Sequence, residues 1–156
     1  MKEDIKIDVF TNYQIKQMLN YYKRVKNREK SFFAYRDYTM IIVFLGTGMR
    51  LGEVVNLRWK DINWENNTIT VFGKKRIQSS LPITDKLKNE LAEYKIFVQQ
   101  VFKKPCEYVF ALKDNKQMTS GAVKCVFKRL KDKMNFNDVR LSPHTFRHTE
   151  NVKSFV

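Results

Sequence analysis

An arginine flanked by glycines is the first feature of the sequence that can act on a phosphate. Residues 46–53 read GTGMRLGE, and Arg50 directly follows a glycine turn at the expected start of a helix. There its guanidinium fork and the positive helix end can both face an oxyanion. Glu53 lies three residues later on the same helix face and can orient Arg50. Taken alone, the segment favours an ordinary turn between two helices with a surface salt bridge.

A pair of lysines lies at the tip of an expected hairpin, where residues 73–76 read GKKR. From such a tip, Lys74 or Lys75 can reach into a nucleic-acid groove or donate a proton to a leaving oxygen. Charged hairpin tips are common, so this segment alone indicates only a solvated turn.

Both histidines of the chain fall in residues 144–148, which read HTFRH. His144 and Arg147 are three residues apart, so they share one face of a helix. One can handle a proton while the other holds a phosphate oxygen. His148 is rotated away from His144, and we assign it a structural, supporting role.

Hydrophobic spacing and capping residues predict the elements that position these segments. The predicted helices cover about residues 13–25, 33–47, 50–57, 85–102 and 121–134, and a further helix begins at Ser142. Residues 23–30 are expected to be a basic connection. The predicted inward faces of the first two helices are Ile15, Met18, Leu19 and Tyr22, and Tyr38, Ile41, Ile42 and Leu45.

Between these helices the hydrophobic period changes to that of strands. Three short strands are predicted over residues 59–63, 68–72 and 76–83, with turns at 65–67 and 73–75. A sheet this small packs against helices rather than standing alone. The fold class is therefore α+β, mainly α-helical with a small three-stranded antiparallel sheet.

Composition points to an anionic partner. The 156 residues are enough for one domain. They include 30 Lys and Arg against 16 Asp and Glu, which gives a net charge of +14. No window approaches ~18 consecutive apolar residues, so no membrane span is expected. The N-terminus lacks a signal peptide, and Cys106 and Cys125 form no metal or redox spacing. We therefore expect a cytoplasmic protein without a metal site.

The basic residues are concentrated in two runs, residues 16–36 and residues 124–133. Either run alone is most simply a solvated helix face. Two runs together with the overall charge favour a surface that binds a phosphate backbone. Neither run carries the broad apolar face of a helix that lies on a membrane.

At this point the three segments resemble a known family. Residues 47–54 resemble the first arginine motif of the tyrosine recombinases, the phage-integrase family. Residues 71–83 resemble that family's lysine hairpin, and residues 144–149 resemble its His-x-x-Arg box. Order and spacing agree over residues 11–149. Type IB topoisomerases use a similar constellation, but the compact spacing favours an integrase.

The resemblance implies DNA strand cleavage and rejoining without metal, ATP or other cofactor. In the family, a tyrosine attacks a DNA phosphodiester, forms a 3′-phosphotyrosine and releases a 5′-hydroxyl. Preorganised guanidinium groups can stabilise the charge that gathers on the phosphoryl oxygens. Carried over to this chain, the roles fall on Arg50 and Arg147 for the non-bridging oxygens, Lys74 (or Lys75) for the departing 5′-oxygen, His144 for proton transfer and Glu53 for support of Arg50.

The chain departs from the family pattern after the His-x-x-Arg box. A second His or Trp and then the nucleophilic Tyr are expected there, but all seven tyrosines precede Arg147. Residues 150–156 match the family poorly, and residues 1–10 leave no room for a core-binding domain. We therefore expect residues 1–156 to be a single partial catalytic domain, unable to cleave DNA by itself. It should be a monomer alone, whereas intact family members act as tetramers on DNA.

Two other interpretations remain open. The chain can be a non-catalytic basic remnant that binds duplex DNA, or competes with an intact recombinase. A basic RNA-binding protein also fits the composition but leaves the three ordered motifs unexplained. A phosphate clamp predicts selective losses from changing Arg50 or Arg147, whereas a generic basic surface predicts uniform losses from any Lys or Arg.

Overall fold

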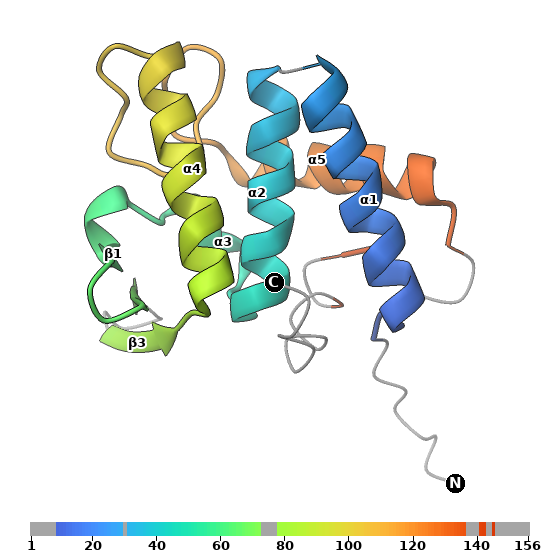
Figure 1. Cartoon of the computed structure of the whole chain (residues 1–156), viewed down its shortest axis with the longest axis horizontal. Coiled ribbons are helices and arrows are strands. Elements are labelled where there is room, and N and C mark those ends of the chain that lie inside the picture. Colours follow the sequence, from blue (N-terminus) through green and yellow to red (C-terminus); the bar gives the residue numbers. More distant parts are fainter. Residues whose placement is uncertain (1–8, 30, 73–77, 137–140, 143–144, 146–156) are drawn as a thin grey trace, which may run out of the picture.

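The computed structural model describes residues 9–29, 31–72, 78–136, 141–142 and 145. Its elements, in chain order, are α1 (Asn12–Glu29), α2 (Phe32–Thr47), α3 (Leu51–Val55), the 3₁₀ turn η1 (Trp59–Asp61), β1 (Ile62–Asn63), β2 (Thr68–Phe72), β3 (Gln78–Pro82), α4 (Asp85–Val101) and α5 (Ser120–Met134). Helices α4, α2 and α1 stand side by side, α5 crosses behind them, and the sheet lies beside one end of α4 (Figure 1). The predicted mainly helical fold with a three-stranded antiparallel sheet is confirmed.

Helix α2 is the centre of the core. It packs against both α1 and α4, and Phe44 meets Phe127 of α5 edge to face at 5.3 Å. Its predicted inward residues are buried, but so is every other residue from Ala34 to Thr47 except Tyr35. A helix covered on several sides needs apolar residues all round, which explains why this helix lacks a polar face.

Helix α1 is longer than its sequence pattern predicts. Thr11 caps it, accepting a hydrogen bond from the Gln14 N–H at 3.1 Å while its own N–H donates to Gln14 Oε1 at 2.8 Å. The prediction of a basic connection from residue 23 is wrong, because the helix continues to Glu29. Lys and Arg are good helix formers, and Lys26 packs its ammonium 4.6 Å from the ring centroids of Tyr35 and Tyr38.

The three strands form a meander in the order β1-β2-β3, with Ile62 opposite Ile69 and Phe72 opposite Gln78. The predicted strand over residues 59–63 is wrong for its first three residues, which form η1. The Asp61 carboxylate accepts the Arg58 N–H at 3.1 Å, and this short-range bond favours a turn over an extended strand. The predicted turn at residues 65–67 is present, with Asn67 in the left-handed region at φ 53°.

The predicted starts of the later helices are confirmed. Thr84 caps α4 and Thr119 caps α5, each accepting a backbone N–H three residues on, at 3.1 Å. In the described part of the chain, no helix has the length and apolar character needed to cross a membrane.

Candidate phosphate site and nucleic-acid interface

The turn that precedes Arg50 is fixed by hydrogen bonds and by the burial of Met49. Gly48 ends α2 in the left-handed region, at φ 67°, and its N–H donates to the Phe44 carbonyl at 3.1 Å. The Thr47 hydroxyl donates to the Val43 carbonyl at 2.6 Å and accepts the Met49 N–H at 3.2 Å. Met49 is buried in the core. Arg50 therefore leaves the core from a backbone fixed on its N-terminal side.

The Arg50 side chain is exposed at the start of α3. Its backbone N–H donates to Glu53 Oε1 at 2.8 Å, which satisfies a donor at the helix start. Glu53 thus contacts the backbone of Arg50 and forms no ion pair with its guanidinium. Among the residues that the structure describes, no acidic side chain forms an ion pair with that guanidinium. An exposed, uncompensated guanidinium beside a short helix start can hold an oxyanion.

The far end of α3 is also tied down. The Asn56 side chain donates to the Gly52 carbonyl at 2.8 Å. Gln117, from the segment before α5, donates through Nε2 to the Val55 carbonyl at 2.8 Å and to Asn56 Oδ1 at 2.9 Å. These bonds make α3 a fixed support for Arg50.

The remaining predicted site residues, Lys74, Lys75, His144, Arg147 and His148, lie outside the described residues. What the structure describes is their surroundings. The strands that flank the lysine segment are paired as far as Phe72 and Gln78. Next to His144, Thr145 is buried, and its N–H donates to Ser142 Oγ at 3.4 Å, which is the bond expected from Ser142 as a helix cap.

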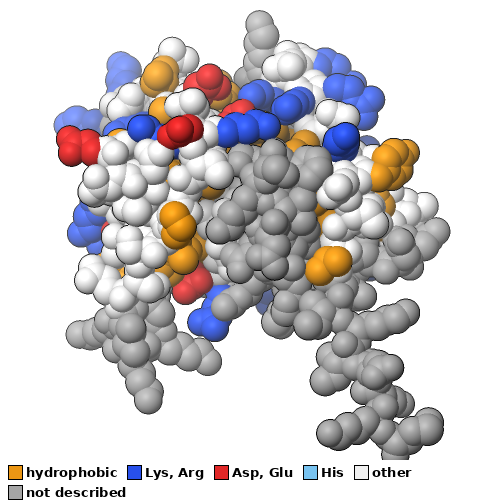
Figure 2. Space-filling view, turned by 60° about the horizontal axis from the view of Figure 1, so that its bottom comes forward, with side chains coloured by type: hydrophobic (Ala, Val, Ile, Leu, Met, Phe, Trp, Pro, Cys, Tyr) orange, Lys and Arg blue, Asp and Glu red, His pale blue; other side chains and the backbone are white. Residues whose placement is uncertain are grey.

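Helix α5 carries one apolar and one basic face. Val123, Val126, Phe127 and Leu130 are buried. Lys124, Lys128 and Lys131 recur every three or four residues and are exposed, so they form one row along the helix. Because these lysines are exposed, the basic run at residues 124–133 contributes a solvent-facing positive surface. In the view of Figure 2, Lys and Arg side chains also gather along the upper edge of the molecule, with some Asp and Glu among them.

A buried ion network is the feature that sequence reasoning missed. Asp37 Oδ1 accepts from Arg36 Nε at 3.0 Å, and Asp37 Oδ2 accepts from Arg129 of α5 at 3.1 Å. Arg36 also donates to the Ala111 carbonyl at 3.1 Å and lies over the rings of Phe32 and Phe33. The network joins α2, α5 and the segment before α5. The charged pair within an otherwise apolar predicted helix was the available signal.

Four tyrosines are kept protonated by their surroundings. Burial, with the nearby Glu93 and Glu90 charges, raises the pKa of Tyr35 to about 12. Burial first, and then the charge of Glu90, whose Oε1 accepts a hydrogen bond from the Tyr38 hydroxyl at 3.3 Å, raises the pKa of Tyr38. Burial also raises the pKa of Tyr22 and of Tyr94. These phenols are poor nucleophiles near neutral pH, because their ionised form is disfavoured.

No cluster of three or more His, Cys, Asp or Glu suited to a metal ion occurs in the part of the chain that the structure describes. Cys106 and Cys125 are free thiols.

An exposed arginine fixed at a helix start and the basic face of α5 place positive charge on the surface of this α+β domain, and comparison with known proteins identifies its family. Residues 8–151 match the model of the phage integrase family. The chain belongs to this family, the tyrosine recombinases.

Named relatives are consistent with this membership. The chain is 30% identical over 115 residues to tyrosine recombinase XerA of Pyrococcus furiosus, covering 73% of this chain and 39% of that protein. It is 31% identical over 117 residues to tyrosine recombinase XerD of Staphylococcus epidermidis, covering 74% of this chain and 39% of that protein. The chain thus spans about two fifths of the length of these curated relatives.

Solved structures share the fold. The crystal structure of XerA recombinase superposes with a TM-score of 0.76 at 17% identity, covering 99% of this chain and 52% of that one. XerH recombinase bound to its palindromic difH substrate gives a TM-score of 0.75 at 18% identity, covering 96% and 42%. A lambda integrase dimer bound to a core site gives 0.69 at 17%, covering 96% and 50%. The predicted catalytic-domain fold is therefore confirmed.

Proposed function

We propose that this chain is the DNA-binding catalytic portion of a site-specific tyrosine recombinase. The observation that carries the proposal is the presentation of Arg50. It is exposed, it has no ion-pair partner among the described residues, and it leaves a turn locked by Gly48, Thr47 and buried Met49. Solved relatives of the same fold are bound to DNA, which supports duplex DNA as the partner.

In the proposed reaction, Arg50 and Arg147 bind the two non-bridging oxygens of the scissile phosphate. A tyrosine oxygen forms a bond to phosphorus, and the bond from phosphorus to the 5′-oxygen breaks. Lys74, with Lys75 as the alternative, gives that oxygen its proton, and His144 assists proton transfer. Glu53 supports Arg50 through its backbone contact. The cleavage needs no metal or other cofactor.

The nucleophile is the part of this proposal that the present residues do not provide. All seven tyrosines precede Arg147, so none holds the place in the motif order where the family resemblance puts the nucleophile. We infer that a protein of these 156 residues alone forms no covalent adduct with DNA. Residues 1–156 then act as part of a catalytic domain, in the cytoplasm, monomeric when free and contributing to a tetramer on DNA only within an intact recombinase.

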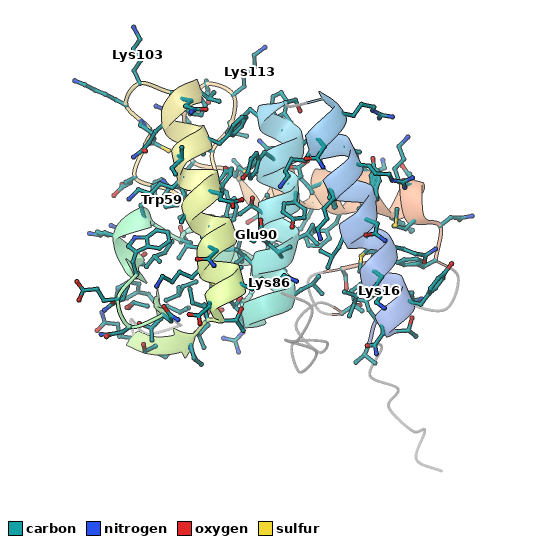
Figure 3. The ribbon with its side chains drawn as sticks, viewed as in Figure 1. Lys16, Trp59, Lys86, Glu90, Lys103 and Lys113 are labelled. Carbon is teal, nitrogen blue, oxygen red and sulfur yellow. The ribbon has the colours of Figure 1, made fainter. Side chains whose placement is uncertain are left out.

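The test compares Arg50→Ala with Lys103→Ala, an exposed lysine on the loop after α4 (Figure 3). Binding of a nicked duplex in the presence of vanadate, which imitates the phosphoryl geometry, is measured by fluorescence anisotropy. A phosphate clamp predicts that vanadate strengthens binding by the wild type, that Arg50→Ala loses this gain, and that Lys103→Ala keeps it. Loss of an oxyanion donor costs on the order of 2.7–4 kcal/mol in comparable sites. Equal small losses from both changes would instead support the generic basic DNA-binding remnant.

A separate gel assay for a covalent DNA–protein adduct tests the nucleophile. An adduct formed by these residues alone would show that one of the existing tyrosines reacts, contrary to the proposal.

A further inference from the structure

Outside the predicted catalytic residues, the structure holds a groove of about 560 Å³ between the outer face of α1 and the C-terminal turn of α5. These helices are in contact, and α5 passes behind α1 (Figure 1). The side chains that line it are polar or basic apart from Met134: Gln17, Asn20, Lys23, Arg24, Asn27 and Lys133.

The charge of this groove is not compensated from within the described protein. None of its described lining residues is acidic, and Lys23, Arg24 and Lys133 form no ion pair with a described residue. Bringing like charges from two helices together destabilises an isolated fold. An anion bound in the groove would remove that penalty.

A neighbouring groove of about 1020 Å³ shows the contrast. It also contains two arginines, Arg36 and Arg129, but Asp37 lies between them and accepts hydrogen bonds from both. These two arginines are therefore paired with Asp37, whereas Lys133, which lines both grooves, forms no ion pair with a described residue. The cations of the smaller groove have no such internal task.

The spacing along α1 suits an extended anion. Gln17, Asn20, Arg24 and Asn27 lie three or four residues apart, so they form one row. From Gln17 to Asn27 the row is about 15 Å long at 1.5 Å per residue. Phosphates of one DNA strand rise by about 3.4 Å each along the helix axis while winding around it, so a row of this length can meet a few successive phosphates. Amide and guanidinium donors both bind phosphate oxygens.

We propose that this groove is a second contact for the phosphate backbone of duplex DNA, separate from the catalytic residues. The proposal extends the proposed DNA binding and rests on it. Lys133 lies two residues after Lys131, which places it on a different face of α5 from the row of Lys124, Lys128 and Lys131. The groove is therefore a contact surface separate from that row, and the two are tested separately.

Three triple variants with the same loss of charge test the proposal. The groove variant is Lys23→Gln, Arg24→Gln and Lys133→Gln, and the α5 variant is Lys124→Gln, Lys128→Gln and Lys131→Gln. The control is Lys103→Gln, Lys104→Gln and Lys113→Gln. All nine side chains are exposed, and Figure 3 shows Lys103 and Lys113 pointing away from the helices at the end of α4. Circular dichroism verifies that each variant is folded.

Affinity for a duplex of at least 30 base pairs is measured between 50 and 200 mM salt. With a slope of about −0.9 per phosphate contact, losing three contacts makes the log–log slope shallower by about 2.7. The affinity lost across this fourfold range of salt then becomes about 40-fold smaller. We expect this change for the groove variant and no change for the control. A variant with Lys23→Arg and Lys133→Arg keeps the charge and should keep the wild-type slope.

The outcomes separate the two proposals. A groove variant that behaves like the control, while the α5 variant loses affinity, overturns the groove and leaves DNA binding intact. Absence of duplex binding by the wild type overturns both. If the groove variant binds DNA normally but no longer binds a polyglutamate peptide, the groove serves an acidic protein segment and the proposal is wrong.

Discussion

Comparing Asp37→Ala with Arg129→Ala separates the stabilising role of the buried Arg36–Asp37 pair from that of the exposed Arg129. The Asp37 side chain is 9% exposed and Arg36 is 5% exposed, whereas Arg129 is 60% exposed. Without Asp37, the Arg36 guanidinium stays buried beside aromatic rings, with the Ala111 carbonyl as its remaining acceptor. A buried charge without a counter-charge is strongly unfavourable.

The expected magnitudes differ enough to measure. Breaking a buried ion pair by removing one partner costs about 3–5 kcal/mol. Arg129→Ala costs about 0–1 kcal/mol, because water screens the exposed Arg129–Asp37 ion pair and can solvate Asp37 in its place. Domains are stable by only about 5–15 kcal/mol, so Asp37→Ala removes a large part of the total.

Urea unfolding followed by far-ultraviolet circular dichroism measures both changes. With an m-value of about 2 kcal/mol/M, Asp37→Ala lowers the unfolding midpoint by about 2 M, and Arg129→Ala by less than about 0.5 M. A double change, Arg36→Met with Asp37→Leu, removes both charges and should recover much of the loss. If Asp37→Ala cost no more than Arg129→Ala, or if the double change were worse than Asp37→Ala, the buried-charge reasoning would be refuted.

Three further predictions concern stability. Gly48→Ala should lower the free energy of unfolding by about 1–2 kcal/mol, because Gly48 has φ 67°. Gly52→Ala, at a helical position with open space around it, should raise it by up to about 1 kcal/mol. Equal effects of the two changes in thermal unfolding would contradict the assignment of backbone strain to Gly48. Tyr94→Phe should leave stability unchanged or raise it by about 1 kcal/mol, because the buried Tyr94 hydroxyl has no hydrogen-bond partner among the described residues. A loss above 1 kcal/mol in urea unfolding would show that this hydroxyl does form a hydrogen bond. The free energy of unfolding should fall as pH rises from 10 towards 12. The pKa of Tyr35 is about 12 in the folded state against 10 in the unfolded state, so the folded state binds more protons in this range. Tyr35→Phe should make this fall shallower, and an unchanged slope would contradict the pKa shift.

Local sequence signals located most of the helices correctly. Thr11, Ser31, Thr84 and Thr119 each accept a backbone N–H three residues later, as capping residues do. Such bonds depend only on near neighbours in the chain, so the sequence reveals them. The exceptions follow the same logic. The end of α1 packs Lys26 against Tyr35 and Tyr38 of the next helix. The turn η1 combines the local bond from the Arg58 N–H to Asp61 with a bond from the Trp59 N–H to the Glu107 carbonyl, which is distant in sequence.

The candidate site was predictable in part. The glycine before Arg50 and the glutamate after it indicated a helix start, and Gly48 and Glu53 have those tasks. Glu53 was expected to orient or support Arg50, and the contact that the structure shows is with the backbone N–H of Arg50. The groove between α1 and α5 was not foreseen, because Lys133 is over a hundred residues from Lys23 and only packing brings them to one surface.

The sequence by itself determined the family and the order of the motifs, because residue type and spacing along the chain carry that information. It also determined the helix caps and the charge excess, which are local or additive properties. Only the tertiary structure decided which charges are compensated. Asp37 pairs with arginines from two helices, whereas Arg50 and the cations of the α1–α5 groove form no ion pair with a described acid. Electrostatic pairing depends on distance in space, and distance in sequence does not reveal it.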